Sequence, residues 1–531
     1  MSSCVLGSGG FYAFALTATL CLNTFPVSAQ TLTATKISDE QITAVGLTLE
    51  HYNKLLNGQA FQQNGIMTYA GYQYAVYWNS SRHVCIYRKK ISTGVAQTLE
   101  LTDYANTLQD SHNTISMGIC PTDGTIHLSF DHHDTLLNYR KSVNNLATTP
   151  DAFSWVMSNF GAVQHNFNGT NVHLVTYPRF AVAPSGRMLF ECREGSSGNG
   201  DAYLWEYNGT TGTWTTLGKY IDGVVSNENP YLFGIDFDRN GRLHVSWCWR
   251  GTPDGSTNHD IYYAYSNDNG RTWYNNAGTL VGTTGTTPMT LSMTSVRVWT
   301  IAQNRGYINQ ESQAVDKKGR IHVLASYIPD ASADITIFDT ARTRAVVYQF
   351  YRDTAGVWHR NALNVLAKSN RGQIAFDSLD NAYVTLYNVR LLGATARSGW
   401  TDWHMLSNLE DNRFYSEVLI DKYRLLSGNL LSYVYPVRTT GGIYILTYSL
   451  SGQTGIIEKK SDGDVSSAPQ YFTRHGDVLH FQGVAPDAPY TICTADGAVV
   501  NKGRGSSIDI GSLNAGCYMV RINGNSVKFI K

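Results

Sequence analysis

The sequence predicts an all-β protein, a seven-bladed β-propeller followed by a small C-terminal β-sandwich-like domain. A turn-plus-strand unit, in which a glycine opens a short apolar strand, recurs at Gly124–Phe130, Gly186–Phe190, Gly241–Trp247 and Gly319–Leu324. The repeated glycines stand roughly 55 to 80 residues apart, a spacing that suits propeller blades with insertions. Helical periodicity is nearly absent along the chain.

Further strand-like runs carry this pattern from about residue 40 to about residue 460, and they are 66–78, 84–88, 262–265, 345–351, 381–387 and 442–448. At roughly 55 to 60 residues per blade, this length predicts about seven blades arranged radially, so that few sheet edges are exposed. The segment Ser266–Trp273 matches the Asp-box turn that lies between the strands of sialidase-like propellers.

Composition places the chain among ordinary globular proteins with a large core. The 531 residues are 42% hydrophobic and 15% charged, and 41 basic residues balance 41 acidic ones. A nucleic-acid partner would require a clustered basic surface, so none is expected. The eight cysteines are scattered and do not predict a disulfide scaffold.

The first 29 residues are expected to be a secretion signal. An apolar run from Phe11 to Leu22 precedes small residues that suit cleavage after Ala29, although no Lys or Arg stands before the run. The run is shorter than the roughly 20 residues that span a bilayer, so a membrane span is not expected. The propeller is then predicted over residues 30–460.

Residues 461–531 differ in character and form the predicted C-terminal domain. A linker-like Ser-Asp-Gly-Asp-Val-Ser-Ser-Ala-Pro stretch is followed by short alternating strands, an Ala-Gly-x-Tyr-x-Val-Arg segment and a terminal Lys-Phe-Ile-Lys. This end resembles the C-terminal sorting domain of the type IX secretion system of Bacteroidetes, and a small carbohydrate-binding β-sandwich is the alternative. Either interpretation implies a secreted or cell-surface protein, and the first implies the type IX machinery as a partner.

The candidate site lies in four fragments: Asp110–Asn113, Phe130–His133, Thr176–Arg179, and Cys192–Asp201. They are rich in imidazole, phenol and guanidinium groups, which suit proton transfer beside an anionic substrate, and they lack the paired carboxylates of a typical glycosidase. By contrast, His127, His244 and His322 all occupy one position of the repeated strand, so we expect them to mark blade register.

These fragments, with His244–Arg250 and Asn258–Asp260, resemble the propeller polysaccharide lyases that include the ulvan lyases, especially polysaccharide lyase family twenty-five. The similarity covers most of residues 55–275. It implies a secreted lyase that cleaves the linkage between rhamnose 3-sulfate and a uronic acid in an anionic, ulvan-like polysaccharide. The product would carry an unsaturated uronate end.

The resemblance also implies roles for individual residues. His112 and Tyr177 would be the acid/base pair, Arg193 would neutralise the uronate carboxylate, and His132 would lie close by. Tyr231 could line the same site, Arg250 and Arg179 are further candidates for the carboxylate, and His133 is a supporting residue. Which of His112 and Tyr177 is the base stays open, because a histidine needs little tuning near neutral pH whereas a tyrosine base needs a lowered pKa.

No cofactor is required for such an elimination. Cys248 and His259 could hold a structural zinc or calcium ion, because thiolate and imidazole are ligands that zinc favours. An equally good interpretation is that Cys248 is a buried thiol and His259 a histidine in a blade turn. Two other functions stay open: a hydrolase acting on rhamnose–glucuronate glycans, and a non-catalytic glycan-binding propeller.

Overall fold

The computed structural model describes residues 31–51, 54–329, 335–368, 370–408, 417–451, 472–475, 477–481, 485–494, 498–514, 517–522 and 525–531. The chain divides into two compact units, Met1–Gly455 and Ile456–Lys531. The expected secretion signal lies outside the described residues. In the described part, no helix is long and apolar enough to cross a membrane.

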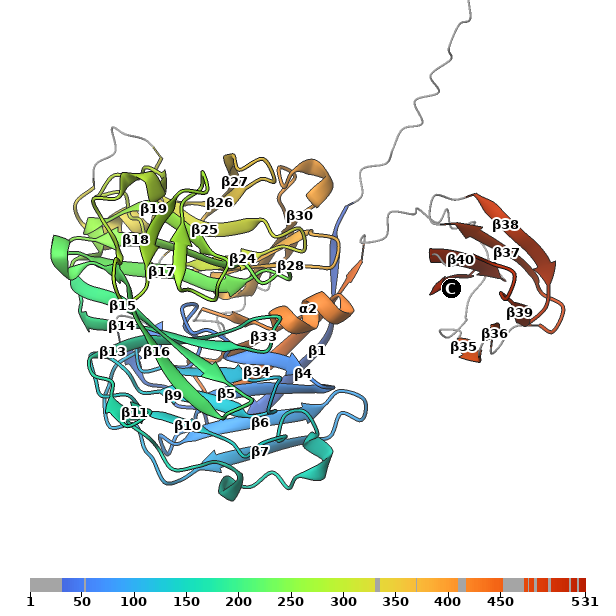
Figure 1. Cartoon of the computed structure of the whole chain (residues 1–531), viewed down its shortest axis with the longest axis horizontal. Helices are drawn as coiled ribbons and strands as arrows, with labels where there is room; N and C mark the ends of the chain where they lie inside the picture. Colours follow the sequence, from blue (N-terminus) through green and yellow to red (C-terminus); the bar gives the residue numbers. More distant parts are fainter. Residues whose placement is uncertain are drawn as a thin grey trace, which may run out of the picture. The chain divides into compact units, whose positions relative to one another are not determined.

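The first unit is built almost entirely of antiparallel sheets that follow one another in chain order, as the colours of Figure 1 show. The first three larger sheets have the following strands: β4 (Ile66–Tyr69), β5 (Tyr72–Trp78), β6 (Val84–Lys90) and β7 (Ala96–Leu101); β8 (Ile115–Ile119), β9 (Ile126–Phe130) and β10 (Tyr139–Lys141); β13 (Val175–Val182), β14 (Met188–Ser196), β15 (Asn199–Asn208) and β16 (Thr213–Asp222), with β22 (Met289–Thr290) at its edge.

The next larger sheets are the following: β17 (Asn229–Phe237), β18 (Leu243–Arg250), β19 (Asn258–Ser266), β20 (Thr272–Tyr274) and β21 (Leu280–Thr283), with β23 (Arg297–Trp299) paired to β19; β24 (Ser312–Val315), β25 (Ile321–Tyr327), β26 (Val346–Arg352) and β27 (Trp358–Leu366); β28 (Gln373–Phe376), β29 (Ala382–Leu386), β30 (Arg390–Ala394) and β31 (His404–Ser407); β32 (Leu419–Ile420), β33 (Leu430–Pro436) and β34 (Ile443–Ser451) with β1 (Thr33–Thr43).

Small elements connect these sheets. They are the hairpins β2 (Glu50–His51) with β3 (Lys54–Leu55) and β11 (Asn166–Phe167) with β12 (Thr170–Asn171), and the helices α1 (Phe338–Arg342) and α2 (Lys422–Gly428). Seven single 3₁₀ turns lie among the described residues, at 150–152, 157–159, 224–226, 255–257, 294–296, 387–389 and 396–398.

The sheets close into a ring around their first strands. Strand β13 contacts both β8 and β17, β24 contacts β17 and β28, and β32 contacts β28 and β4. The early strand β1 pairs with β34, so a single sheet joins the start of the unit to its end. Such closure leaves few free sheet edges and gives a propeller-like architecture.

A loop segment lies inside the ring and contacts several of the first strands. The side chain of Gln63 donates to the carbonyl oxygens of Phe180 on β13 and Ile235 on β17, both at 3.2 Å. From the opposite side, Gln373 on β28 donates to Ala60 O at 2.9 Å. These bonds satisfy polar groups of the ring and tie the segment that carries Phe61 to β13, β17 and β28.

The Asp-box segment forms the turn between β19 and β20. Asp268 accepts from the backbone N–H of Thr272 at 2.9 Å and Gly270 donates to Ser266 Oγ at 2.8 Å, while Trp273 is fully buried. Gly270 has a φ of +82°, which an L-residue rarely adopts. The motif therefore acts as a turn with an aromatic anchor.

The second unit contains two small sheets. One has the order β35 (Phe472–His475), β36 (Val478–Phe481), β39 (Ser507–Asp509), and the other has the order β38 (Val499–Arg504), β37 (Pro489–Thr494), β40 (Cys517–Ile522), β41 (Asn525–Ile530). A core of its own, including Leu479, Ile492 and Val520, packs between their strands.

Candidate functional site

One end of the ring collects the predicted site residues. In each sheet the first two strands are antiparallel, so the start of the first strand and the end of the second lie at the same end. His112 precedes β8 and His133 follows β9, Tyr177 lies near the start of β13, and Arg193 lies near the end of β14. Residues distant in sequence thus meet at this end.

The register histidines lie at the opposite ends of their strands and are buried. His127 contacts Tyr139 OH at 2.7 Å, His244 contacts Tyr263 OH at 3.0 Å, and His322 contacts Asp316 at 3.2 Å. Each therefore has a hydrogen-bonding partner within or next to its own sheet.

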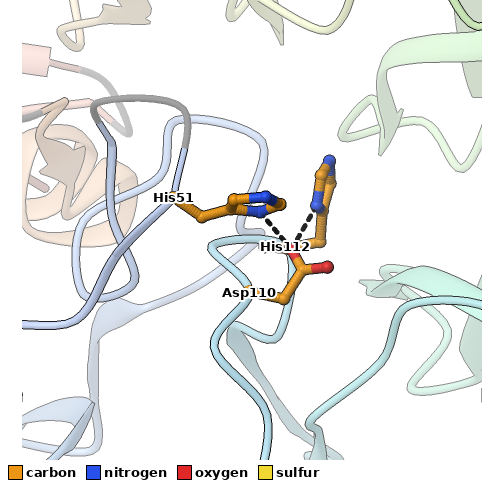
Figure 2. Close-up of side chains that lie close together, drawn as sticks. All are labelled: His51, Asp110 and His112. Atoms are coloured by element: carbon orange, nitrogen blue, oxygen red, sulfur yellow. Dashed lines mark hydrogen bonds and ion pairs between the residues drawn. The ribbon is translucent and has the colours of Figure 1, made fainter.

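Three imidazoles converge on the carboxylate of Asp110. Its Oδ1 accepts from His51 Nδ1 at 3.3 Å and from His112 Nδ1 at 2.5 Å, and its Oδ2 accepts from His133 Nδ1 at 2.5 Å. Figure 2 shows the rings of His51 and His112 directed at the carboxylate, with the second ring nitrogen of His112 pointing away from it. The ring of His112 also stacks on that of His133, with centroids 4.1 Å apart.

Burial decides the protonation of His112. It lowers the pKa of His112 to about 4 against the opposing effect of Asp110. Although burial also disfavours an ionised carboxyl, the hydrogen bonds from His112 and His133 hold the pKa of Asp110 far below its usual range. At neutral pH, His112 is therefore a neutral imidazole whose Nδ1–H binds a carboxylate, which leaves a lone pair on Nε2.

Tyr177 has a strained backbone at the centre of the site. Its φ is +59°, and the β13–β14 register shifts between Thr176 and Arg179. A bulky residue before a proline is disfavoured in this conformation, and such strain is typical of functional sites. The bulge aims the Tyr177 ring at three other rings, with centroid distances of 5.7 Å to His112, 5.1 Å to Phe61 and 5.9 Å to Tyr231.

The phenol of Tyr177 stays protonated near neutral pH. Burial raises its pKa well above the ordinary value, and the neighbouring Tyr231 adds to the increase. The cations of Arg193, Arg371 and Arg250 oppose this shift without reversing it.

Arg193 lies behind the two tyrosines and is already bound within the protein. Its Nη2 donates to Asp134 Oδ1 at 2.6 Å and to Thr176 Oγ1 at 2.8 Å, and its Cζ stands 5.2 Å from the centroid of the Tyr177 ring. Its side chain is 3% exposed, and Nε is buried with no hydrogen-bond partner among the described residues. The guanidinium thus holds positive charge close to Tyr177.

Tyr231 and Arg250 complete this side of the site. The Tyr231 hydroxyl contacts Ser197 Oγ at 3.0 Å and accepts from Arg250 Nη1 at 3.4 Å. Arg250 is partly exposed and its Cζ lies 5.3 Å from the Tyr231 ring centroid. Its Nε donates to Thr252 O at 3.0 Å and its Nη2 donates to Pro253 O, so these bonds fix a guanidinium at the surface beside the buried Arg193.

Two predicted residues lie away from this cluster. His132 is fully buried, with Nε2 3.0 Å from Ser129 Oγ and Nδ1 3.2 Å from Thr135 Oγ1, so it holds the loop that carries His133. Arg179 is buried against Glu191 at 3.0 Å, and its Nη1 donates to the Tyr177 carbonyl at 3.5 Å. Both residues support the site from within the fold.

Cys248 and His259, the predicted metal ligands, have different surroundings. Burial raises the pKa of the Cys248 thiol, and His259 is bridged to Glu228 at 3.0 Å and to Asp260 at 3.2 Å. In the described part of the chain, the group whose ligand atoms lie within 4.8 Å of one another is His51, Asp110 and His112. Neither Cys248 nor His259 belongs to that group.

Sequence reasoning assigned no role to His51, Asp110, Asp134 or Phe61. Asp110 lies two residues before His112 in the sequence. A carboxylate so close to a candidate catalytic histidine could have predicted that Asp110 orients the imidazole. His51 and Phe61 reach the site through a hairpin and a loop that no local pattern connects to it.

Comparison with known proteins assigns the chain to a family. The BNR repeat-containing family matches residues 72–366, more than half of the sequence. The chain belongs to this family. Its match with the BNR repeat-containing family spans the sheets from β5 to β27, which include His112, Tyr177, Arg193 and Arg250.

Curated relatives of this BNR-repeat chain include ulvan lyases. It is 26% identical over 247 residues to the long isoform of the Glaciecola sp. (strain KUL10) enzyme, covering 38% of this chain and 24% of that protein. It is 25% identical over 231 residues to the short isoform of Alteromonas sp. (strain LOR), covering 35% and 44%. The chain thus spans less than half the length of these relatives.

Solved structures share the fold. Polysaccharide lyase Uly1 aligns with a TM-score of 0.61 at 18% identity, over 78% of this chain and 99% of that one. A PL25 ulvan lyase bound to -[GlcA(1-4)Rha3S]- aligns with a TM-score of 0.57 at 14% identity, over 77% and 95%. The propeller-like architecture is common to all three.

Proposed function

We propose that this protein is a polysaccharide lyase that cleaves a uronate-containing sulfated polysaccharide of the ulvan type by β-elimination. The observation that carries the proposal is the pairing of a neutral, carboxylate-bound His112 with a protonated Tyr177, whose ring centroids lie 5.7 Å apart beside two guanidinium groups. The ulvan lyase relatives agree with this chemistry and suggest the substrate class.

In this proposal His112 is the base. Its Nδ1–H bond to Asp110 orients the ring and leaves the Nε2 lone pair to take the C5 proton of the uronate. Because burial lowers the pKa of the imidazole, Nε2 stays unprotonated over a wide pH range.

Tyr177 is the acid. As the C5–H electrons form the C4=C5 double bond, the C4–O4 bond breaks and O4 receives the phenolic proton. A buried, protonated phenol suits this role, whereas a tyrosine base would need a lowered pKa and the shift here has the opposite sign. We thus assign the two roles that the sequence left open: His112 takes a proton from the substrate, and Tyr177 gives one to it.

The substrate carboxylate is stabilised by charge from Arg193 and by contact with Arg250. Asp134 and Thr176 already occupy Nη2 of Arg193, and its Nε is buried, so Arg193 acts from behind the tyrosines. Arg250 is partly exposed and can donate to the carboxylate as negative charge moves onto it.

For the wider organisation, the proposal keeps what the sequence predicts. We interpret the larger sheets of the first unit as seven blades, closed by β1 on β34. The proposed enzyme is secreted or lies at the cell surface. Its secretion signal would be residues 1–29, and its type IX sorting domain would be residues 461–531.

Product analysis tests the reaction class. Purified protein is incubated with ulvan and with other uronate polymers, and absorbance and fragment masses are followed. A lyase releases an unsaturated uronate that absorbs in the ultraviolet. A hydrolase gives new reducing ends without absorbance, and a glycan-binding propeller leaves the polymer intact; either result refutes the proposal.

A further inference from the structure

Besides Arg193, a second group of cations lies near Tyr177. The Cζ atom of Arg371, in the loop before β28, stands 5.4 Å from the centroid of the Phe61 ring, and that centroid is 5.1 Å from the Tyr177 ring. Arg371 is close enough to Tyr177 to oppose the rise of its pKa. One aromatic ring therefore separates this guanidinium from the proposed acid.

The hairpin β2–β3 brings a second cation to the same place. His51 and Lys54 are partners across the hairpin, and while His51 contacts Asp110, the ammonium of Lys54 donates to Asn370 and lies 3.4 Å from Glu417. Arg371 Nη1 also lies 3.4 Å from Glu417, and its Nε donates to Asn309 O at 2.7 Å. A single buried carboxylate thus holds both cations next to the reaction site.

Among the described residues of this group, cations outnumber carboxylates. Arg342, the third cation, lies 3.8 Å from the buried Glu311, so in the described part three cations face two carboxylates. Burial lowers the pKa of Lys54 to about 8, and despite Glu417 the neighbouring Arg371 and Arg342 add to the decrease. Buried cations that lie close together are costly, and a bound anion would offset that cost.

Arg371 can reach such an anion. Its side chain is 11% exposed and that of Lys54 is 12% exposed, whereas Glu417 is fully buried. No hydrogen bond joins Arg371 Nη2 to the residues that the structure describes. The exposed edge of the guanidinium therefore faces outward while Glu417 and Asn309 hold its other edge in place.

We propose that Arg371 and Lys54 form an oxyanion-binding position beside the reaction site, which takes a sulfate ester of the polysaccharide on a sugar next to the uronate that reacts. The inference rests on the proposed function for the identity of the polymer, but not for the presence of an anion site. Guanidinium and ammonium groups are the usual partners of sulfate and carboxylate oxygens. The three fixed cations repel a metal cation and favour an anion at this position.

Inorganic sulfate tests the position without any turnover. Thermal unfolding is followed against sulfate, with chloride at equal ionic strength as reference, for the wild type, Arg371→Gln, Lys54→Met and the control Lys318→Gln, which removes an exposed charge from a distant turn. We expect sulfate to stabilise the wild type and Lys318→Gln, and to lose that effect in the other two. Equal stabilisation of all four overturns the proposal. If Arg371→Gln does not fold, Lys54→Met and Arg371→Lys replace it. Weaker stabilisation by sulfate in these two variants than in the wild type supports the proposal, and equal stabilisation overturns it.

Matched oligosaccharides then identify the ligand. Sulfated and chemically desulfated ulvan fragments are compared, and Arg371→Gln is expected to raise KM for the sulfated fragment by about tenfold or more while changing that for the desulfated one little. An equal rise for both fragments would assign the position to a carboxylate and refute the sulfate assignment. A wild type that cleaves neither fragment refutes the proposed function and leaves the thermal sulfate result standing.

Discussion

Replacing Asp110 with asparagine tests the central arrangement of the site. The carboxylate of Asp110 accepts three imidazole N–H groups, from His51, His112 and His133. An amide has one acceptor oxygen and one donor nitrogen, so at least one imidazole would face a donor with its own N–H. The histidine that meets the amide nitrogen must then move its proton to Nε2 or lose the contact.

The size of the effect follows from these contacts. Two of the three bonds, those of His112 and His133, are short and charge-assisted, and losing such bonds costs about 1.5 to 3 kcal/mol each. If both contribute to the transition state, the barrier rises enough to lower kcat by roughly 10²- to 10⁴-fold. Loss of the negative charge also lowers the pKa of His112 further, which weakens the base.

The assay is initial-rate release of unsaturated uronate from ulvan by ultraviolet absorbance, with thermal unfolding measured in parallel. Asp103→Asn is the control, because Asp103 pairs with Arg140 at 2.8 Å away from the histidines and its carboxylate is 37% exposed. We expect the control to retain activity. If Asp110→Asn keeps kcat/KM within about threefold of the wild type while folded, the assignment of His112 as an oriented base is refuted.

Four further predictions concern other residues. Tyr177→Phe keeps the ring packing, so it should lower kcat by roughly 10²- to 10⁴-fold with little change in unfolding temperature; full activity in ultraviolet assays excludes Tyr177 as the acid. The pKa of His112 is about 4 in the folded protein, against an ordinary value of 6.5. As pH falls, the unfolded chain therefore binds a proton at this histidine before the folded protein does. The stability that neutral His112 contributes is full above pH 6.5 and is lost as pH falls to about 4. That loss, at most about 3 kcal/mol, is measured as the difference in urea unfolding between the wild type and His112→Asn, and an equal pH dependence of the two would contradict it. His132→Ala should destabilise the fold by roughly 2 to 4 kcal/mol through a cavity and lost hydrogen bonds, whereas the exposed His173→Ala should not; urea unfolding compares them, and equal stabilities refute a supporting role for His132. Cys248→Ala and His259→Ala should leave the metal content of the purified protein unchanged in elemental analysis, and loss of a bound ion in either variant would restore the predicted metal site.

Local patterns were sufficient for the architecture of the first unit. The Gly-x-x-His repeat predicted strands that begin alike, and the structure places β9, β18 and β25 at those repeats. Alternation and turn residues encode such strands over a few positions, because side chains on a strand alternate between two faces. The candidates His112, Tyr177 and Arg193 could be named for the same reason, since each lies in a short fragment at a strand end.

The sequence by itself determined the all-β character, the repeated strands and the fragments that supply imidazole, phenol and guanidinium groups. Only the tertiary structure decided which side chains meet. His133 lies against His112 while His132 is buried in the loop, and Arg193 is held by Asp134 while Arg250 remains partly exposed. His51, Phe61 and Arg371 join the site from a hairpin, an axial loop and a distant sheet. The physical reason is that a closed ring brings strand ends together irrespective of their separation along the chain, and a one-residue change in position reverses the direction of a side chain.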